Sequence, residues 1–426
     1  MVALRLDPLI VSRLVAGLTD GVVLVTGTNG KTSTCHMLRS AMAEPGRPIV
    51  ANEAGYNLVQ GIVTVVVLVR DLRGGARSTM GVFEVDEAAL GSVAAALSPR
   101  LVVVLNLFRD QLDRHAELDR VAAAIGAGLA TVRCDVLLNA DDVRVTSLAA
   151  RARGRVRYFS LDRPVDREAV VTAADVSPCP DCGARLAYDW VAYAQLGRYE
   201  CPSCGLRRPT ASVAVTAAHP MPGGGWRVWV RAGPEHLMAE TTLRGVYNVD
   251  NLVAAVAAAV HLGVPARRAL AAVAACGPVA GRGSATTVGV GEVVVLLGKN
   301  PTGVAQVLQA YVCPDPAAPL LVVLNDTAAD GRDVSWIWDA PFEALAGRTG
   351  PVLVAGTRAP SMLVRLEYAE VAAMACASVD AALDRLVALV RDGGRAHVLT
   401  TYSGVQPVDE RLGRLGRRPV EAATPR

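Results

Sequence analysis

The sequence is nearly without lysine: only Lys31 and Lys299 interrupt a basic complement of 43 residues that is otherwise arginine. Its formal net charge of +3 excludes the strong positive field of a typical nucleic-acid-binding protein. No apolar run reaches the roughly 18–20 residues of a membrane-spanning helix, and the first residues carry charges where a signal peptide has its apolar centre. Hydrophobic residues nevertheless make up 52% of the 426 positions. We therefore expect a globular cytoplasmic protein with two or three domains.

Cysteine is present, and its spacing is informative. Nine cysteines in a chain without an export signal favour thiols or metal ligands over disulfides. Four of them form two Cys-x₂-Cys pairs with the spacing of a zinc ribbon, and these are Cys179, Cys182, Cys201 and Cys204. Four thiolates complete a tetrahedron and leave no position for water, so we expect structural zinc. The alternatives are four unrelated thiols or a nucleic-acid-binding ribbon, although the insert's arginines are too scattered to form a dense basic face.

Short apolar runs alternate with alanine-rich helical stretches along most of the chain, which predicts an α/β fold with a doubly wound sheet. In the first half, the expected strands are residues 21–27, 61–69, 81–84, 101–105 and 136–139. In the second half, they are residues 292–297, 319–324, 351–354 and 397–401. Residues 277–283 are rich in glycine and are expected to link the two series. The residues from Asp409 onward are expected to form a basic, partly mobile tail.

A glycine-rich loop joins the first expected strand to a helix expected at residues 32–43. Glycines let such a loop wrap around phosphate oxygens, the helix N-terminus offers unpaired N–H groups, and a lysine adds a positive charge. The hydroxyl of Thr32 suits Mg²⁺. The generic phosphate loop has a further glycine where this sequence has Val25, so the loop is a variant, and the alternative is an accidental Gly-Lys-Thr. The candidate nucleotide-binding residues are Gly27, Thr28, Asn29, Gly30, Lys31, Thr32 and Ser33.

This variant loop resembles that of the Mur ligase superfamily of ATP-dependent amide-forming enzymes. Further segments match in the expected order, at residues 83–87, 106–115 and 243–255. The resemblance implies that Glu84 binds Mg²⁺ and that Asn248 and Asn251 contact the adenine base. Taken alone, Glu84 is equally well explained as a solvated acid at the end of a strand.

The departures from the superfamily pattern are also informative. Gln111 stands where many of these ligases have a metal-binding histidine, so either Gln111 or His115 remains open as a contact to Mg²⁺. The carbamylated lysine of some relatives has no counterpart, because no lysine lies in the stretch 116–131. The first expected strand begins near residue 21, so we expect no N-terminal domain of the kind that grips the UDP group of soluble precursors.

The cysteine insert resembles one branch of the superfamily, the MurT subunits of lipid II isoglutaminyl synthases, and residues 324–339 match that branch as well. The resemblance implies that Asp326 binds the ribose of ATP. It further implies that an aspartate, Asp333 with a contribution from Asp330, serves amidation by orienting a partner's histidine or the incoming ammonia. Lys299 lies in a second glycine-flanked loop, where it is expected either to meet phosphate or to be an exposed loop residue.

The resemblance implies a Mur-ligase-like ATP-binding domain at residues 1–276 with a zinc ribbon inserted at 175–210, a Rossmann-like C-terminal α/β domain at 277–408, and a basic tail at 409–426. The implied activity is ATP- and Mg²⁺-dependent amidation of the D-glutamate α-carboxylate in the lipid II stem peptide, at the inner face of the cell membrane. No cysteine lies in a Gly-x-Cys-x-Gly elbow, so ammonia is expected from a separate GatD-type glutamine amidotransferase in a heterodimer. The alternatives are an amino-acid-adding ligase of the muramyl-peptide or folylpolyglutamate type and a non-catalytic zinc-ribbon scaffold.

Overall fold

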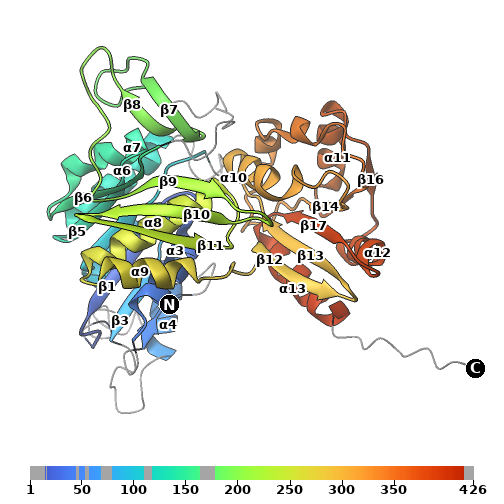
Figure 1. Cartoon of the computed structure of the whole chain (residues 1–426), viewed down its shortest axis with the longest axis horizontal. Helices are drawn as coiled ribbons and strands as arrows, with labels where there is room; N and C mark the ends of the chain where they lie inside the picture. Colours follow the sequence, from blue (N-terminus) through green and yellow to red (C-terminus); the bar gives the residue numbers. More distant parts are fainter. Residues whose placement is uncertain are drawn as a thin grey trace, which may run out of the picture. The chain divides into compact units, whose positions relative to one another are not determined.

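The computed structural model describes residues 15, 17–44, 48–52, 57–68, 79–109, 118–163 and 178–416. The chain divides into two compact units (Figure 1). Unit 1 comprises Met1–Phe108 and Glu117–Gly277, and unit 2 comprises Arg109–Ala116 and Pro278–Arg426. Within the described ranges, no helix combines the length and the apolar character needed to cross a bilayer.

A nine-stranded sheet forms the centre of unit 1. Its strands are β1 (Gly21–Thr26), β2 (Ile49–Val50), β3 (Met80–Glu84), β4 (Leu101–Val104), β5 (Asp135–Asn139), β6 (Val156–Leu161), β9 (Val213–Pro220), β10 (Trp226–Ala232) and β11 (Glu235–Thr241). They lie in the order β11-β10-β9-β6-β5-β4-β1-β3-β2. All pairings from β2 to β9 are parallel, and β10 and β11 extend the sheet in antiparallel fashion. The carboxyl ends of β1, β3 and β4 therefore meet at one edge, where α/β sheets bind ligands.

Helices cover both faces of this sheet. They are α3 (Lys31–Met42), α4 (Val59–Leu68), α5 (Leu90–Leu97), α6 (Leu118–Thr131), α7 (Val143–Ser147), α8 (Val246–His261) and α9 (Ala266–Ala274), with the short 3₁₀ segments η1 (Glu87–Ala89) and η2 (Leu148–Arg151). Because successive strand residues point to opposite faces, Val23 and Val25 join the core beneath α3, α8 and α9. Leu24 joins the core beneath α4, α5 and α6. This three-layer arrangement confirms the predicted α/β class.

The strand expected at residues 61–69 is wrong, because α4 occupies Val59–Leu68. A ten-residue apolar run has no periodicity that separates a buried strand from a buried helix. The topology decides the matter: β2 and β3 are parallel neighbours, and parallel neighbours need a crossover connection, usually a helix. Ile62 and Val66, one helical turn apart, are both buried in the core.

The cysteine insert lies between β6 and β9 in sequence and forms its own two-stranded sheet of β7 (Ala187–Tyr193) and β8 (Leu196–Glu200) (Figure 1). The two strands pair antiparallel, and the loops that carry the four cysteines flank them. A small apolar cluster that includes Val143 of α7 joins the insert to unit 1.

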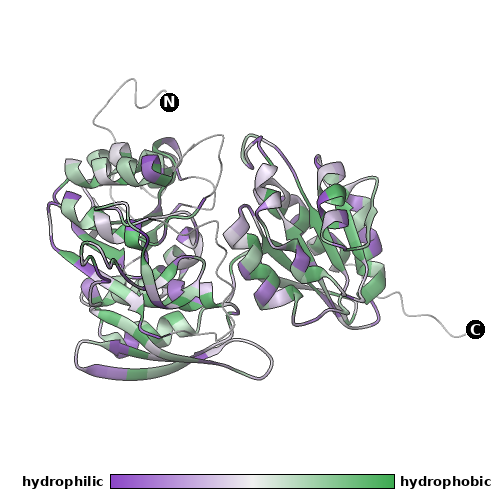
Figure 2. Cartoon of the chain, turned by 90° about the horizontal axis from the view of Figure 1, so that it is seen from above, coloured by the Kyte–Doolittle hydropathy of each residue, from purple (hydrophilic) through white to green (hydrophobic). Residues whose placement is uncertain are grey.

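Unit 2 is built around a six-stranded sheet of β12 (Arg282–Val288), β13 (Gly291–Leu297), β14 (Leu320–Val323), β15 (Val352–Ala355), β16 (Ala373–Ala375) and β17 (Arg395–Thr400). The order is β12-β13-β17-β14-β15-β16, and only the β12–β13 pairing is antiparallel. Its helical segments are α10 (Pro301–Val307), the π-helix η4 (Leu308–Val312), η5 (Ser335–Trp338), η6 (Phe342–Leu345), α11 (Ala359–Tyr368), α12 (Val379–Val390) and α13 (Tyr402–Gly416). Apolar cores fill both faces, and Figure 2 shows the hydrophobic residues along the central strands.

Helix α13 continues past Asp409, where the tail was expected to begin. It runs to Gly416, and Val408 and Leu412, one turn apart, have no exposed surface in the core of unit 2. The arginines of this stretch favoured a tail, but Val408 and Leu412, spaced i, i+4, give the helix a buried apolar face. Residues 409–416 are therefore part of the folded unit, and residues 417–426 lie outside the described residues.

Candidate functional site

The glycine-rich loop runs from the end of β1 to the start of α3, as the sequence predicts. Gly30 precedes the helix with a φ of 89°, in the left-handed region that favours glycine, and no side chain caps the helix. A Cβ on Gly27 would lie 2.9 Å from the backbone N of Asn106, so only glycine allows this close approach. A helix N-terminus that follows such a loop is a ready anion-binding site.

Residues 106–108, here called the bracing segment, hold this loop in place. Asn106 forms two hydrogen bonds with the backbone of Asn29, which donates from its N–H at 2.9 Å and accepts at its carbonyl at 3.2 Å. The hydroxyl of Thr28 donates to the carbonyl of Phe108 at 3.1 Å and accepts from its N–H at 3.0 Å. The side chain of Thr28 thus holds the loop in place, and its backbone N–H also donates to the carbonyl of Asn106 at 2.9 Å.

Lys31 lies at the first position of α3, and its side chain donates hydrogen bonds to a backbone carbonyl and to a carboxylate. Its Nζ donates to the carbonyl of Gly27 at 2.6 Å and to Oε1 of Glu87 at 2.9 Å. The side chains of Lys31 and Glu87 are only 12% and 8% exposed. Glu87 lies within the matching segment 83–87, but nothing in the sequence spacing indicates its ion pair with Lys31. Ser33, also predicted here, is buried on α3.

The two predicted Mg²⁺ ligands lie side by side. The hydroxyl of Thr32 donates to Oε2 of Glu84 at 2.5 Å, although 52 residues separate them in sequence. The side-chain amide of Asn52 pairs with the backbone of Glu84, accepting from its N–H at 2.9 Å and donating to its carbonyl at 2.8 Å. Hydroxyl and carboxylate oxygens are the ligands that Mg²⁺ prefers, so the pair fits this ion. Gln111 and His115 lie outside the described residues.

Helix α8 brings the two predicted adenine contacts to the same loop. Asn251 is buried, and a Cβ on Gly30 would lie 2.1 Å from its Oδ1. That oxygen accepts a hydrogen bond from the hydroxyl of Thr34 at 3.4 Å. The amide of Asn251 donates to Oδ1 of Asn248 at 3.3 Å, and Asn248 donates to the carbonyl of Arg244 at 2.8 Å. The structure therefore gathers the phosphate-type loop, the Mg²⁺ pair and the α8 asparagines into one site.

The four cysteines of the insert also come together, with their Sγ atoms all within 4.8 Å of one another. Cys179 and Cys204 are 3.6 Å apart, and Cys182 and Cys201 are 3.5 Å apart. Four sulfurs bound to zinc at about 2.3 Å would be about 3.8 Å apart, so the cluster fits a tetrahedral metal ion. Hydrogen bonds from the backbone N–H groups of Cys204 and Ser203 lower the pKa of Cys201 to about 7, whereas hydrogen bonding with Cys201 raises the pKa values of Cys204 and Cys182. Thiolate is the form that binds metal.

Two buried carboxyl groups contact the hairpin of the insert, and neither was expected from the sequence to have a role. Asp250 lies between the two α8 asparagines, and burial raises its pKa to about 8, although Tyr193 and Asn139 donate hydrogen bonds to it. Burial raises the pKa of Asp141 to about 6, against the opposing effect of Arg208, which donates at 2.6 Å. The sequence contains a hint for Asp250 alone, as a single acid within a helix rich in alanine and valine.

In unit 2, Asp330 is buried and fully engaged in hydrogen bonds. Its Oδ2 accepts from the hydroxyl of Ser403 at 2.5 Å and from the hydroxyl of Thr327 at 2.6 Å. Its Oδ1 accepts from the backbone N–H of Ser403 at 2.7 Å. These contacts tie the loop after β14 to the first turn of α13, which is a positioning arrangement.

The other two predicted aspartates are more open. Asp326 follows β14, as expected, and its Oδ1 accepts from the hydroxyl of Thr357 at 2.7 Å. Asp333 is partly exposed, and its Oδ1 accepts from the backbone N–H of Ser335 at 2.8 Å, which lowers the pKa of its carboxyl group. Asp333 is thus ionised at neutral pH, and its side chain is partly open to solvent.

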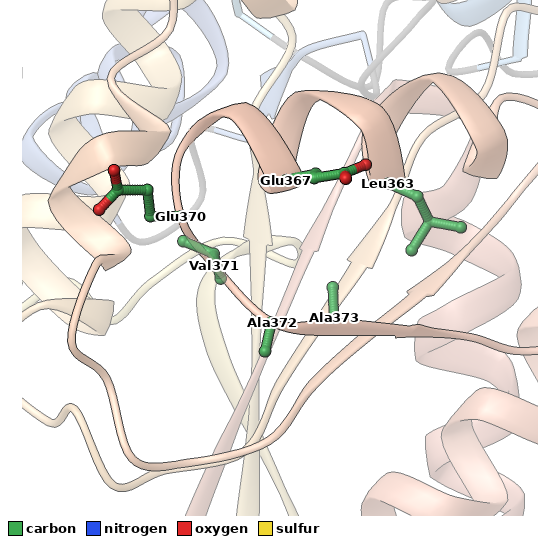
Figure 3. A pocket seen from close by; sticks show the side chains of 6 residues that line it. All are labelled: Leu363, Glu367, Glu370, Val371, Ala372 and Ala373. Carbon is green, nitrogen blue, oxygen red and sulfur yellow. The ribbon is translucent and has the colours of Figure 1, made fainter.

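A hollow of roughly 390 Å³ lies on unit 2 between α11 and β16 (Figure 3). It is lined by Leu363, Glu367, Glu370, Val371, Ala372 and Ala373. None of the predicted site residues lines it, so it is separate from the site proposed from the sequence. On the same unit, Trp338 (49% exposed), Val364 (46%) and Tyr368 (73%) leave large apolar surface accessible, and the rings of Trp338 and Tyr368 touch edge to face.

Comparisons with known proteins agree with this arrangement. Residues 25–182 match the Mur ligase middle domain family, and residues 297–405 match the MurT ligase C-terminal family. The chain is 29% identical over 406 residues to the lipid II isoglutaminyl synthase (glutamine-hydrolyzing) subunit MurT of Staphylococcus aureus strain N315, covering 95% of this chain and 90% of the relative. It is 32% identical over 339 residues to the subunit of the same name from Streptococcus pneumoniae, covering 79% and 74%.

Among solved structures, a pseudomurein peptide ligase type C from Methanothermus fervidus has the same fold, with a TM-score of 0.73 and 20% identity over 93% of this chain and 79% of that one. The sequence similarity, the two matching domains and the gathered motifs of unit 1 lead to one conclusion: the chain is a ligase that belongs to the MurT family of the Mur ligase superfamily.

Proposed function

We propose that this protein is the synthetase subunit of a lipid II isoglutaminyl synthase, which converts the α-carboxylate of D-glutamate in the lipid II stem peptide to an amide. The observation that carries the proposal is the glycine-rich loop of unit 1, with Lys31, Thr32 and Glu84 gathered beside it, in a chain whose second unit matches the MurT ligase C-terminal family. The similarity to two subunits with this name supports the same assignment.

The proposed chemistry is carboxylate activation. The γ-phosphoryl group of ATP is transferred to the glutamate carboxylate, and ammonia displaces phosphate from the resulting acyl phosphate to leave the amide. Lys31 supplies positive charge to the phosphates from the first turn of α3. Thr32 and Glu84 would hold Mg²⁺, which neutralises phosphate charge when bound. Asn248 and Asn251, which are joined by a hydrogen bond, are proposed to contact the adenine base, and zinc held by the four cysteines would have a structural role.

Within unit 2, the geometry favours Asp333 over Asp330 for the amidation step. Asp330 has both carboxylate oxygens engaged by Ser403 and Thr327, so it is proposed to fix the loop that carries Asp333. Asp333 is partly exposed and ionised, which suits a group that orients ammonia or a histidine of a partner. Asp326 is proposed to bind the ribose of ATP.

The ammonia is proposed to come from a GatD-type glutaminase subunit in a heterodimer. The described cysteines outside the metal cluster are isolated thiols without the elbow of a nucleophile. The exposed rings of Trp338 and Tyr368 on unit 2 support a protein-binding surface there, since large apolar side chains grouped on a surface mark interaction sites. The proposed place of action is the inner face of the cell membrane, where lipid II presents its stem peptide.

The test is an amidation assay with purified protein, lipid II, ATP, Mg²⁺ and a high concentration of ammonium, followed by mass spectrometry of the stem peptide. The proposal predicts an ATP-dependent conversion of one carboxyl group to an amide. If free glutamate or another amino acid is incorporated instead, the chain is an amino-acid-adding ligase of the muramyl-peptide or folylpolyglutamate type, and the proposal is wrong.

A further inference from the structure

We propose that the turn of the cysteine hairpin, residues 193–195, positions the ATP site. In this proposal Gln195 fixes the bracing segment that holds the phosphate-type loop, and Tyr193 fixes the helix that carries the adenine contacts. The inference rests on the proposed function, since it assumes that ATP binds at the loop. It assigns the insert a role in nucleotide binding in addition to metal binding.

The first contact joins Gln195 to the bracing segment. The side-chain Nε2 of Gln195 donates to the backbone carbonyl of Leu107 at 2.8 Å, and Gln195 is only 2% exposed. Leu107 lies between Asn106 and Phe108, the two residues that form hydrogen bonds with the loop. The bond therefore fixes the peptide unit between Leu107 and Phe108, while Oδ2 of Asp142 accepts a hydrogen bond from the N–H of Leu107 at 2.8 Å. The Oε1 atom of Gln195 is buried and has no hydrogen-bond partner in the described part of the chain, so the Leu107 bond is the polar contact that sets the orientation of this amide.

The second contact joins Tyr193 to α8. The hydroxyl of Tyr193 donates to Oδ2 of Asp250 at 3.0 Å, and both side chains are buried. Asp250 lies between Asn248 and Asn251, and Asn139 at the end of β5 donates to the same carboxyl group. A hydrogen bond to Asp250 therefore fixes the rotation of the helix turn that presents the two asparagines.

The same residue also reaches the bracing segment. The ring of Tyr193 packs against Phe108, with a distance of 6.0 Å between the ring centroids. Ala194, the next residue of the turn, is 4% exposed and belongs to the main core of unit 1. The turn thus lies between the two parts of the proposed nucleotide site. It contacts the bracing segment through residues 107 and 108, and it contacts helix α8 through Asp250.

The hairpin is fixed at its other end as well. The hydroxyl of Tyr199 lies 2.6 Å from that of Thr146 on α7, and the N–H of Gly197 donates to the carbonyl of Asp141 at 3.0 Å. The cysteine loops follow directly, with Cys201 buried next to Tyr199. The four cysteines and the turn at residues 193–195 therefore lie at opposite ends of one short hairpin, so the insert links the cysteine cluster to the nucleotide-binding unit.

A purely structural hairpin makes a different prediction. If residues 193–195 only fill the core, changing their polar atoms alters the stability of the protein but leaves the nucleotide affinity of the folded fraction unchanged. If they position the site, the affinity for nucleotide falls in protein that is still folded, and KM for ATP rises with little change in kcat.

The test uses the full chain with two substitutions that keep volume. Gln195→Met removes the donor to Leu107, and Tyr193→Phe removes one hydroxyl. Arg198→Met, on the exposed side of β8 with its salt bridge to Asp189, is the matched control on the same hairpin. The readouts are the dissociation constant of Mg²⁺–ADP by calorimetry, the thermal midpoint, and KM and kcat for ATP with ammonium. We expect the dissociation constant to rise about tenfold for Gln195→Met and about fivefold for Tyr193→Phe, with the control unchanged.

Each outcome decides a different question. If the unsubstituted chain binds no Mg²⁺–ADP, the proposed function itself fails. If it binds and the folded variants bind equally well, the positioning role is overturned while the proposed function stands. Should Gln195→Met fail to fold, Tyr193→Phe decides, because the loss of one hydroxyl keeps the ring in the core.

Discussion

Substitutions at the ion pair of Lys31 and Glu87 can distinguish the effect of Lys31 on phosphate binding from its effect on the stability of the fold. Lys31→Met removes the charge that is proposed to meet the phosphates of ATP. It also leaves Glu87, 8% exposed, as an unpaired carboxylate that has lost its partner at 2.9 Å. Lys31→Met is therefore expected both to weaken the contact with ATP and to lower the stability of the fold, and only the first effect concerns catalysis.

The magnitudes follow from burial. Removing one partner of a buried ion pair costs about 3–5 kcal/mol, and the small residual exposure of both side chains reduces this to about 2–3 kcal/mol of unfolding free energy. Loss of one preorganised charge at a reacting group lowers kcat by about 10²–10³. Glu87→Gln introduced into the Lys31→Met protein removes the unpaired charge and should recover most of the stability. It should recover none of the activity.

The assay pairs urea unfolding with ammonium-dependent amidation for Lys31→Met, Glu87→Gln and the double variant. The prediction is that stability and activity separate: the double variant unfolds close to the unsubstituted protein but remains inactive. Near-normal turnover in Lys31→Met would refute the assignment of the phosphate-type loop. Recovery of activity in the double variant would show that the loss in Lys31→Met came from the fold alone.

Three further predictions concern the metal cluster, the buried acid and the aspartates of unit 2. Cys201→Ser should remove bound zinc and lower the thermal midpoint by about 10 °C, whereas Cys376→Ser, outside the cluster, should do neither; metal analysis and calorimetry check this. The pKa of Asp250 is raised from 3.8 to about 8 in the folded state, so the folded protein holds a proton that the unfolded chain releases, and stability falls as pH rises between these values. Asp250→Asn should reduce that fall between pH 6.5 and 8 by about 1 kcal/mol per pH unit, and an unchanged slope in chemical unfolding would contradict the burial argument. Asp333→Asn should keep Mg²⁺–ADP affinity but lose amidation, whereas Asp330→Asn should lower the thermal midpoint as well; normal amidation by Asp333→Asn would move the role to another aspartate.

Local sequence patterns were enough to predict most of the central strands and the glycine-rich loop between β1 and α3. Strands β3 and β13 begin one residue before the expected ranges 81–84 and 292–297 and end where expected, because short apolar runs with distinct ends define them. The role expected for Glu84 came from the family resemblance, and its position beside Thr32 agrees with the rule that the carboxyl ends of parallel strands meet at one edge. In α4, by contrast, the β-branched run favoured a strand, and only the need for a crossover between β2 and β3 explains the helix.

What the sequence could not indicate were contacts that depend on the tertiary fold. Asn52 supports the backbone of Glu84 from a short loop with no motif of its own. The insert was expected to be an independent metal ribbon, because four cysteines define such a unit by themselves. Nothing in the spacing of Tyr193 or Gln195 shows that the opposite end of its hairpin enters the core of unit 1.

The measurement that tests the central claim most directly is the nitrogen source of the purified chain with ATP, Mg²⁺ and lipid II. The account predicts amidation with a high concentration of ammonium, no amidation with glutamine, and glutamine-dependent amidation once a GatD-type glutaminase is added. Glutamine hydrolysis by the isolated chain, or a failure to amidate lipid II with ammonium, would contradict it.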